Sequence, residues 1–328
     1  STSLTAGYTI STAKPEISPF PISGFDETQN VTLSSPGAKV YYTTDGSTPN
    51  ENSLLYTEPI AVTSTQTIKA FAVKDGIAPS SVVEAYYFIY QDGDALAGWL
   101  TESIYNNMTW GRNAFYTWEA FKGAYKSLML FEDSVGVSDF RDLFREGSIE
   151  DKKREFAAFM AHVKQETGGS NGLQAIREWC GGPSAYGACV SDYNNPSSGY
   201  GNSATQYYYG RGPLQLSHNN NYALLSKQIY GDYSVLINEP QRLENDAELA
   251  FLAAFWFWTA KLNSVTIHDM LVNNKQFQGF SGFAASIRAI NGAIECGGYT
   301  AQAANRIANY SSFQNKIGVS IQSSTQCY

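Results

Sequence analysis

The sequence predicts two folded parts, a small all-β sandwich followed by a larger, mainly α-helical part. Up to about residue 90, β-branched runs at 40–44, 67–73 and 82–89 alternate with turn clusters rich in Gly, Pro, Asp and Ser. From Ala95 onward the apolar residues recur at helical spacing. We therefore expect four segments, namely a tail at 1–12, a β-sandwich at 13–90, a linker at 91–94 and a helical domain at 95–328.

Length and composition fit such a chain and exclude several classes of protein. The chain has 328 residues, of which 43% are hydrophobic and only 16% are charged, so a large core is possible and full disorder is excluded. The formal net charge of -8, without a long Lys/Arg run, disfavours nucleic acid as a partner. The most apolar segment, 249–258, is about half as long as a membrane-spanning helix, so no membrane partner is expected.

The string VYYTTDGSTP at 40–49 predicts a β-hairpin. The side chains of residues 41–44 alternate between two faces of a strand, and Asp45-Gly46 supplies the positive φ of a tight turn. Five tyrosines of this part could either form a sugar-binding surface or pack the sandwich, and the sequence leaves both roles open. They are Tyr41, Tyr42, Tyr56, Tyr86 and Tyr87.

The clearest helix of the second part is expected between Ser148 and Gly169. Ser148 followed by Asp151 is an N-capping pattern, an apolar stripe follows it, and Gly168 and Gly169 end the helix.

Two glutamates at and after the end of this helix are candidate catalytic groups. Glu166 falls on the buried stripe at the last turn, where burial and the helix dipole favour the protonated carboxyl group that a general acid requires. Exposure to solvent, or an ion pair with Lys164 or Lys153, is an equally open alternative. Glu178 follows a glycine-rich bend, and glycosidic bonds are hydrolysed by two carboxyl groups of this kind.

The first part also resembles a known accessory module. The strings at 40–49, 55–60 and 67–73 are similar to the Ig-like module found at the C-terminal end of chitobiases and in other secreted polysaccharide-degrading enzymes. This resemblance implies an Ig-like sandwich, which could bind polysaccharide or act only as a spacer.

Four ordered strings of the second part resemble the family 19 chitinases. They are FAAFMAHVKQETGG at 156–169, YGRGPLQLSHNNNY at 209–222, AFWFW at 254–258 and INGAIECG at 290–297. The resemblance implies a lysozyme-like, mainly α-helical fold with a deep cleft. It also implies cleavage of β-1,4-linked N-acetylglucosamine polymers with inversion at the anomeric carbon, without a cofactor.

Matched position by position, the resemblance implies a set of site residues. Glu166 takes the place of the general acid, Glu178 that of the general base, and Ser217 that of a serine that holds the attacking water. Side-chain amides that bind the sugar, and a buried charged pair that reaches the acid, are also implied. The amides are Gln215, Asn221 and Asn291, and the pair is Glu295 and Arg306.

Two positions depart from the family pattern. The family usually has His immediately before the acid, whereas here Gln165 occupies that position and His162 lies one turn earlier. Asn220 replaces a usual tyrosine, so a contact in the cleft can be lost.

The four cysteines predict two disulfides in an oxidising compartment, with four buried thiols as the alternative. Cys180 and Cys189 flank a glycine-rich loop that could close easily. Pairing of Cys296 with Cys327 is also what the chitinase resemblance implies.

The leading expectation is a secreted, monomeric endo-chitinase acting on chitin or chitooligosaccharides. Because the first residue is Ser1 and not Met, we expect a processed N-terminus from which an export signal has been removed. A peptidoglycan-cleaving endolysin on the same scaffold and a non-catalytic chitin-binding protein are the alternatives. With only three histidines and no HExxH string, neither a metal nor another cofactor is expected.

Overall fold

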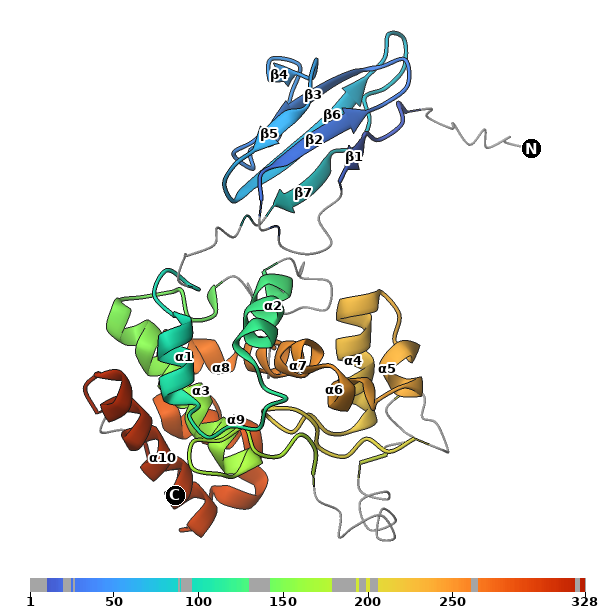
Figure 1. The fold of residues 1–328 in the computed structure, drawn as a ribbon. Helices are drawn as coiled ribbons and strands as arrows, with labels where there is room; N and C mark the ends of the chain where they lie inside the picture. The colour runs from blue at the N-terminus through green and yellow to red at the C-terminus, as the bar shows by residue number, and fades with distance from the viewer. Residues whose placement is uncertain are drawn as a thin grey trace. The chain divides into compact units, whose positions relative to one another are not determined.

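The fold is that of a β unit followed by a helical unit, in a computed structural model of the chain (Figure 1). The chain divides into two compact units, Ser1–Asp94 and Ala95–Tyr328. The fold class predicted from the sequence is confirmed, while the expected linker at 91–94 lies outside the described residues. The structure describes residues 11–19, 25, 27–87, 89, 96–129, 142–178, 193–194, 199–200, 206–260, 265–321 and 325–327.

The first unit contains two antiparallel sheets. One has the strand order β1-β2-β5 and the other the order β4-β3-β6-β7. Alternate residues of each sheet face a shared core, in which Val31 and Val62 of the first sheet and Ile68 of the second are fully buried. The strands are β1 (Glu16–Ser18), β2 (Gln29–Ser34), β3 (Lys39–Thr43), β4 (Leu54–Leu55), β5 (Ile60–Val62), β6 (Gln66–Val73) and β7 (Val83–Tyr87).

The expected hairpin forms, but its connection is longer than the sequence suggested. Strand β3 pairs with β4 through Tyr41 opposite Leu55, so the chain uses residues 44–53 to reverse. Gly46 has the expected positive φ of 77°. The adjacent Asp45 carboxylate accepts hydrogen bonds from the backbone and hydroxyl of Ser47, which makes a local turn at the start of the longer connection.

The five candidate tyrosines do not form a single row. Tyr42 and Tyr56 pack against the core and edge to face against each other, and Tyr87 is fully buried with its hydroxyl donating to the Pro19 carbonyl. Tyr41 lies on the opposite face of its sheet and stacks on Phe71 at 5.8 Å between ring centres. Because strand side chains alternate, one tyrosine set packs the sandwich and the other faces outward.

The second unit is a bundle of helices around α7. This helix is apolar on all sides and is buried along almost its whole length. Among the described residues, no helix combines the length and apolar character that a membrane crossing requires. The helices are α1 (Glu102–Met108), α2 (Trp118–Leu128), α3 (Ile149–Thr167), α4 (Asn219–Tyr230), α5 (Ser234–Asn238), α6 (Arg242–Asn245), α7 (Ala247–Thr259), α8 (Ile267–Leu271), α9 (Gly282–Glu295) and α10 (Ala301–Ile317).

Helix α3 has both of the ends that its sequence predicts. Ser148 is the N-cap and exchanges hydrogen bonds with Asp151, which forms a capping box. At the other end Gly168, with φ 69° and ψ -165°, takes a conformation that only glycine adopts readily and stops the helix. The helix packs on α10, and its last turn carries Glu166.

A buried ionic cluster joins α3, α7 and α8. Glu155 is 1% exposed and accepts hydrogen bonds from Trp258 Nε1 at 3.0 Å, from the Phe144 backbone at 2.9 Å and from His268 Nδ1 at 2.8 Å. The other ring nitrogen of His268 lies 2.8 Å from Glu146. Burial lowers the pKa of His268, but the charge of Glu155 and the hydrogen bonds to both glutamates outweigh it and raise this pKa to about 10.

The cluster predicts how stability depends on pH. The folded pKa of His268 is about 10 and the ordinary value is about 6.5, so its contribution is complete below pH 6.5 and is lost as the pH rises through 10. His268→Gln leaves Glu155 buried without its cation and should cost about 3–5 kcal/mol of unfolding free energy at pH 6. Denaturant unfolding of the wild type and the variant at several pH values measures this difference in unfolding free energy.

Lys275→Gln is the matched control, because Lys275 is an exposed lysine that pairs with Asp269 beside the cluster. It should cost less than about 1 kcal/mol. If His268→Gln also lost less than about 1 kcal/mol of unfolding free energy, the role given to His268 in the cluster would be contradicted. A loss that did not become smaller toward pH 10 would contradict it as well.

Candidate active site

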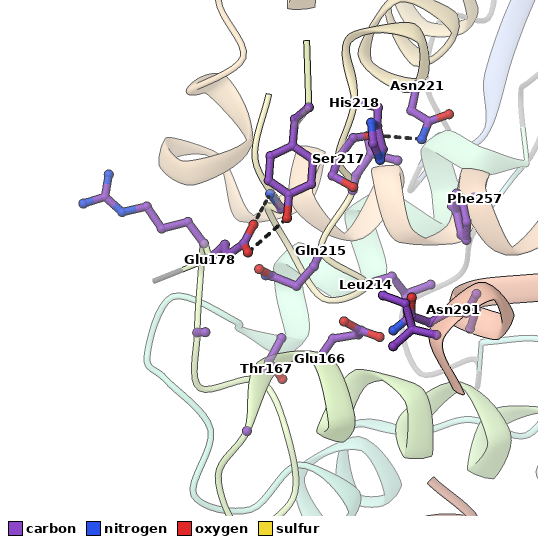
Figure 2. A pocket seen from close by; sticks show the side chains of 18 residues that line it. Glu166, Thr167, Glu178, Leu214, Gln215, Ser217, His218, Asn221, Phe257 and Asn291 are labelled. Carbon is purple, nitrogen blue, oxygen red and sulfur yellow. Dashed lines mark hydrogen bonds between the residues drawn. The ribbon is translucent and has the colours of Figure 1, made fainter. Parts of the chain in front are cut away.

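A cleft of about 750 Å³ lies in the helical unit, and several parts of the fold line it. The end of α3 contributes Glu166, the chain just beyond it contributes Glu178, and α9 contributes Asn291. A further part is the segment between Gly210 and Asn221. Figure 2 shows Glu166 and Glu178 on two sides of the cleft, with Gln215 between them.

Glu166 is held by Arg306 of α10. The guanidinium donates from Nη2 to Glu166 Oε1, and the Glu166 side chain remains 21% exposed. The partner of Glu166 is therefore this arginine, 140 residues further along the chain. The carboxyl group is partly exposed because it lines the cleft. The lysine partners considered from the sequence are close in sequence, whereas this one is close only in the fold.

Arg306 is itself buried and is shared by three side chains. It is 1% exposed and donates from Nε to Glu295 Oε2 at 2.7 Å and from Nη2 to Glu295 Oε1 at 2.8 Å. It also donates from Nη1 to His162 Nδ1 at 3.0 Å. The structure thus brings together the expected charged pair and adds a histidine that was not assigned a role.

Glu178 is fixed by its backbone and its side chain together. Its backbone N–H donates to the Gly210 carbonyl at 2.8 Å, in a short antiparallel bridge. Its carboxylate accepts from Tyr193 Oη at 3.0 Å and from the Gly210 N–H at 3.3 Å (Figure 2). These contacts aim the carboxylate across the cleft.

The bridge beside Glu178 rests on a second buried arginine. Arg211 is 3% exposed and pairs with Glu244 at 2.6 Å, while its Nη1 donates to Tyr222 Oη at 2.9 Å and to the Tyr207 carbonyl at 2.8 Å. Its guanidinium also lies 3.8 Å above the ring of Tyr209. Arg211 therefore anchors the part of the cleft wall to which Gly210 belongs.

The segment after Arg211 turns sharply to present polar groups. Gln215 and His218 have φ of 51° and 70°, which non-glycine residues adopt rarely and mostly where the surrounding contacts impose it. Gln215 Nε2 donates to the Gly212 carbonyl at 2.8 Å, and Asn221 Nδ2 donates to the Ser217 carbonyl at 2.8 Å. Both amides and Ser217 line the cleft.

Asn291 lies at a kink in α9. Its φ of -146° and ψ of 28° break the helix, and its Nδ2 donates to Glu295 Oε1 at 2.9 Å. The amide is thereby connected to the same glutamate that holds Arg306.

The structure brings most of the expected site residues to one place. The six that line the cleft are Glu166, Glu178, Gln215, Ser217, Asn221 and Asn291, while Glu295 and Arg306 lie buried behind Glu166.

One of the two expected disulfides lies within the described residues. Cys296 and Cys327 form it next to the end of α9, whereas Cys180 and Cys189 lie outside the described residues.

Four residues of the site were missed by the sequence reasoning. Tyr193, Arg211 and Glu244 support the Glu178 side, and His162 supports the Glu166 side. For His162 the available signal was its place on an apolar helix face, because a buried imidazole needs hydrogen-bond partners. No local pattern marks Tyr193, Arg211 or Glu244, whose contacts join distant parts of the chain.

A second cluster of titratable groups could in principle hold a metal ion. Ligand atoms of Asp142, Glu146 and His268 lie within 4.8 Å of one another, outside the cleft. A metal needs the lone pair of a neutral imidazole, but both ring nitrogens of His268 face carboxylates and its pKa is raised to about 10. These residues therefore fit an ion-pair cluster better than a metal centre.

Two carboxylates on two sides of one cleft are the arrangement that glycoside hydrolases use. Residues 100–327 match the family described as chitinase class I, glycoside hydrolase family 19, and residues 21–84 match the chitobiase/beta-hexosaminidase C-terminal domain. The chain belongs to glycoside hydrolase family 19 and is an endochitinase that acts with inversion.

The individual relatives agree with this. Endochitinase 2 of Gossypium hirsutum is 32% identical over 256 residues, which cover 71% of this chain and 78% of the relative. Chitinase C from Streptomyces griseus HUT6037 aligns with a TM-score of 0.57 and 34% identity, over 72% of this chain and 100% of that chain. A class IV chitinase from Zea mays aligns with a TM-score of 0.51 and 29% identity, over 70% of this chain and 97% of that chain.

Proposed function

We propose that Glu166 is the general acid and Glu178 the general base in the hydrolysis of chitin. The observation that carries this proposal is that both carboxylates line one cleft while each is held by its own hydrogen-bond network. An inverting mechanism needs one group to protonate the leaving oxygen and another, across the sugar, to activate water.

The charge balance around Arg306 supports the role of Glu166. Glu295 already meets the guanidinium with two hydrogen bonds, so Glu166 is not needed as its counter-ion. Glu166 can therefore carry a proton toward the cleft without leaving an unpaired buried charge. Its partial exposure gives the leaving oxygen access to this proton.

The opposite side supplies the water. Glu178 takes a proton from a water that Ser217 helps to hold, and Tyr193 keeps the carboxylate aimed at it. The water attacks the anomeric carbon from the face opposite to the leaving group.

The side-chain amides bind the N-acetylated sugar. Gln215, Asn221 and Asn291 each donate an N–H within the protein, and Asn221 Oδ1 also accepts from Asn220 Nδ2 at 3.3 Å. The carbonyl oxygens of Gln215 and Asn291, and the second lone pair of Asn221 Oδ1, can accept from acetamido N–H and hydroxyl groups. This chemistry fits chitin and chitooligosaccharides. Peptidoglycan presents similar sugars, so reducing-end release from both polymers, measured side by side, tests the choice.

The disulfide and the polymeric substrate support a secreted enzyme. We propose that it acts as a monomer, because the helical unit by itself supplies every side chain given a role above.

Replacing the acid should abolish activity without unfolding the protein. Glu166→Gln keeps the shape of the side chain but cannot deliver a proton, so kcat on chitin oligosaccharides should fall by about 10²-fold or more. Glu150→Gln, an exposed change at the start of the same helix, should leave kcat unchanged. Full activity of Glu166→Gln with a normal melting curve would remove Glu166 from the mechanism.

The first product should be the α-anomer. If Glu178 activates water and does not attack carbon, hydrolysis of a β-linked substrate inverts the anomeric centre. Proton NMR of early products, recorded before mutarotation, measures the ratio. An initial excess of the β-anomer would overturn the assignment of Glu178 as base.

Chemistry should be confined to the second unit. Residues 95–328 expressed alone should cleave soluble oligosaccharides at close to the full-length rate, because all proposed site residues lie there. If the β unit binds polymer, its removal should lower activity only on insoluble chitin. An equal loss on short oligosaccharides would show that the β unit supports the site.

A further inference from the structure

His162 is a buried polar side chain that the mechanism above does not use. It lies on α3, one turn before Glu166, and is fully buried. Its ring packs against Phe283 at 4.9 Å and Trp258 at 5.8 Å between ring centres. In this apolar setting its two nitrogens need partners, and the partner of Nδ1 is Arg306.

The hydrogen bonds of His162 have only one consistent direction. Arg306 Nη1 can only donate, so His162 Nδ1 accepts at 3.0 Å and the ring proton lies on Nε2. His162 Nε2 then donates to Ser286 Oγ at 2.9 Å, and Ser286 donates to the Phe283 carbonyl at 2.8 Å. A donor-only group at one end and an acceptor-only carbonyl at the other fix every proton in the chain.

This direction requires a neutral imidazole. Burial, and then the charge of Arg306, hold the pKa of His162 well below its ordinary value. His162 therefore gives Arg306 a third acceptor without adding a third negative charge to Glu166 and Glu295. A carboxylate at the same position would bring a third anion to one guanidinium.

We propose that His162 is a positioning residue for the catalytic acid: it fixes the rotation of the Arg306 guanidinium, and so fixes the Nη2 contact to Glu166. The guanidinium is planar, so an acceptor at Nη1 and a bidentate carboxylate at Nε and Nη2 define its plane from two sides. His162 does not touch substrate. The inference rests on the proposed role of Glu166 as the acid.

Three variants distinguish a positioning role of His162 from a merely structural one. His162→Leu removes both hydrogen bonds, while His162→Gln keeps one acceptor and one donor on a single amide. Phe159→Leu is the matched control, because Phe159 lies on the same helix and packs on the same Trp258 but has no contact to Arg306 among those described. The readouts are kcat and KM on a soluble chitooligosaccharide, with melting temperature measured in parallel.

His162→Leu should lower kcat by about 10-fold or more with KM within about twofold of wild type, since a charge-assisted hydrogen bond is lost behind the acid. His162→Gln should recover most of the lost kcat. Phe159→Leu should lower the melting temperature without changing kcat. Wild-type kcat in folded His162→Leu, or a loss that His162→Gln does not recover, would overturn the proposal.

Should His162→Leu fail to fold, Ser286→Ala decides the question. It removes the acceptor that holds the Nε2 proton, and should lower kcat by about 2- to 10-fold with KM unchanged. An unchanged kcat in Ser286→Ala would then overturn the proposal. Measuring Glu166→Gln on the same substrate separates the role of Glu166 as the acid from the role of His162 in positioning it. If Glu166→Gln is inactive while the His162 and Ser286 variants are fully active, only the positioning role is rejected.

Discussion

The active site depends on one buried cation, the guanidinium of Arg306. A buried positive charge must be neutralised and its N–H groups must be satisfied, and α3 and α9 supply the acceptors. The position of α10, which carries Arg306, is thereby tied to the end of α3, where Glu166 lies. The same charge also reaches α9, whose kink at Asn291 directs an amide to Glu295 and into the cleft.

The other side of the cleft also depends on a buried arginine that a glutamate neutralises. Arg211 is neutralised by Glu244 and anchors the bridge that holds Glu178. Because the two arginines lie in separate networks, the two carboxylates can be oriented independently. Separate supports suit an inverting mechanism, in which an acid and a base act on opposite faces of one sugar.

The sequence predicted what depends on local pattern and on motif. The capping box of Ser148, the stop at Gly168 and the burial of α7 follow from short-range rules, and the family strings pointed to the residues that meet at the cleft.

The features that the sequence could not predict depend on contacts between residues far apart in the chain. The bond from Arg306 to His162 spans 144 residues. The alternation of Tyr41 and Tyr42 between two faces was predicted, but which face is covered depends on the second sheet. The ten-residue reversal at 44–53 likewise depends on where β4 pairs.

The most direct test of the account is how the effect of Glu166→Gln depends on the leaving group. A dinitrophenolate leaves without protonation, whereas a sugar hydroxyl does not. The account predicts that Glu166→Gln stays within about tenfold of wild-type kcat/KM on a dinitrophenyl chitooligosaccharide but loses about 10²-fold or more on the unactivated oligosaccharide. Equal losses on the two substrates would show that Glu166 does not deliver the proton.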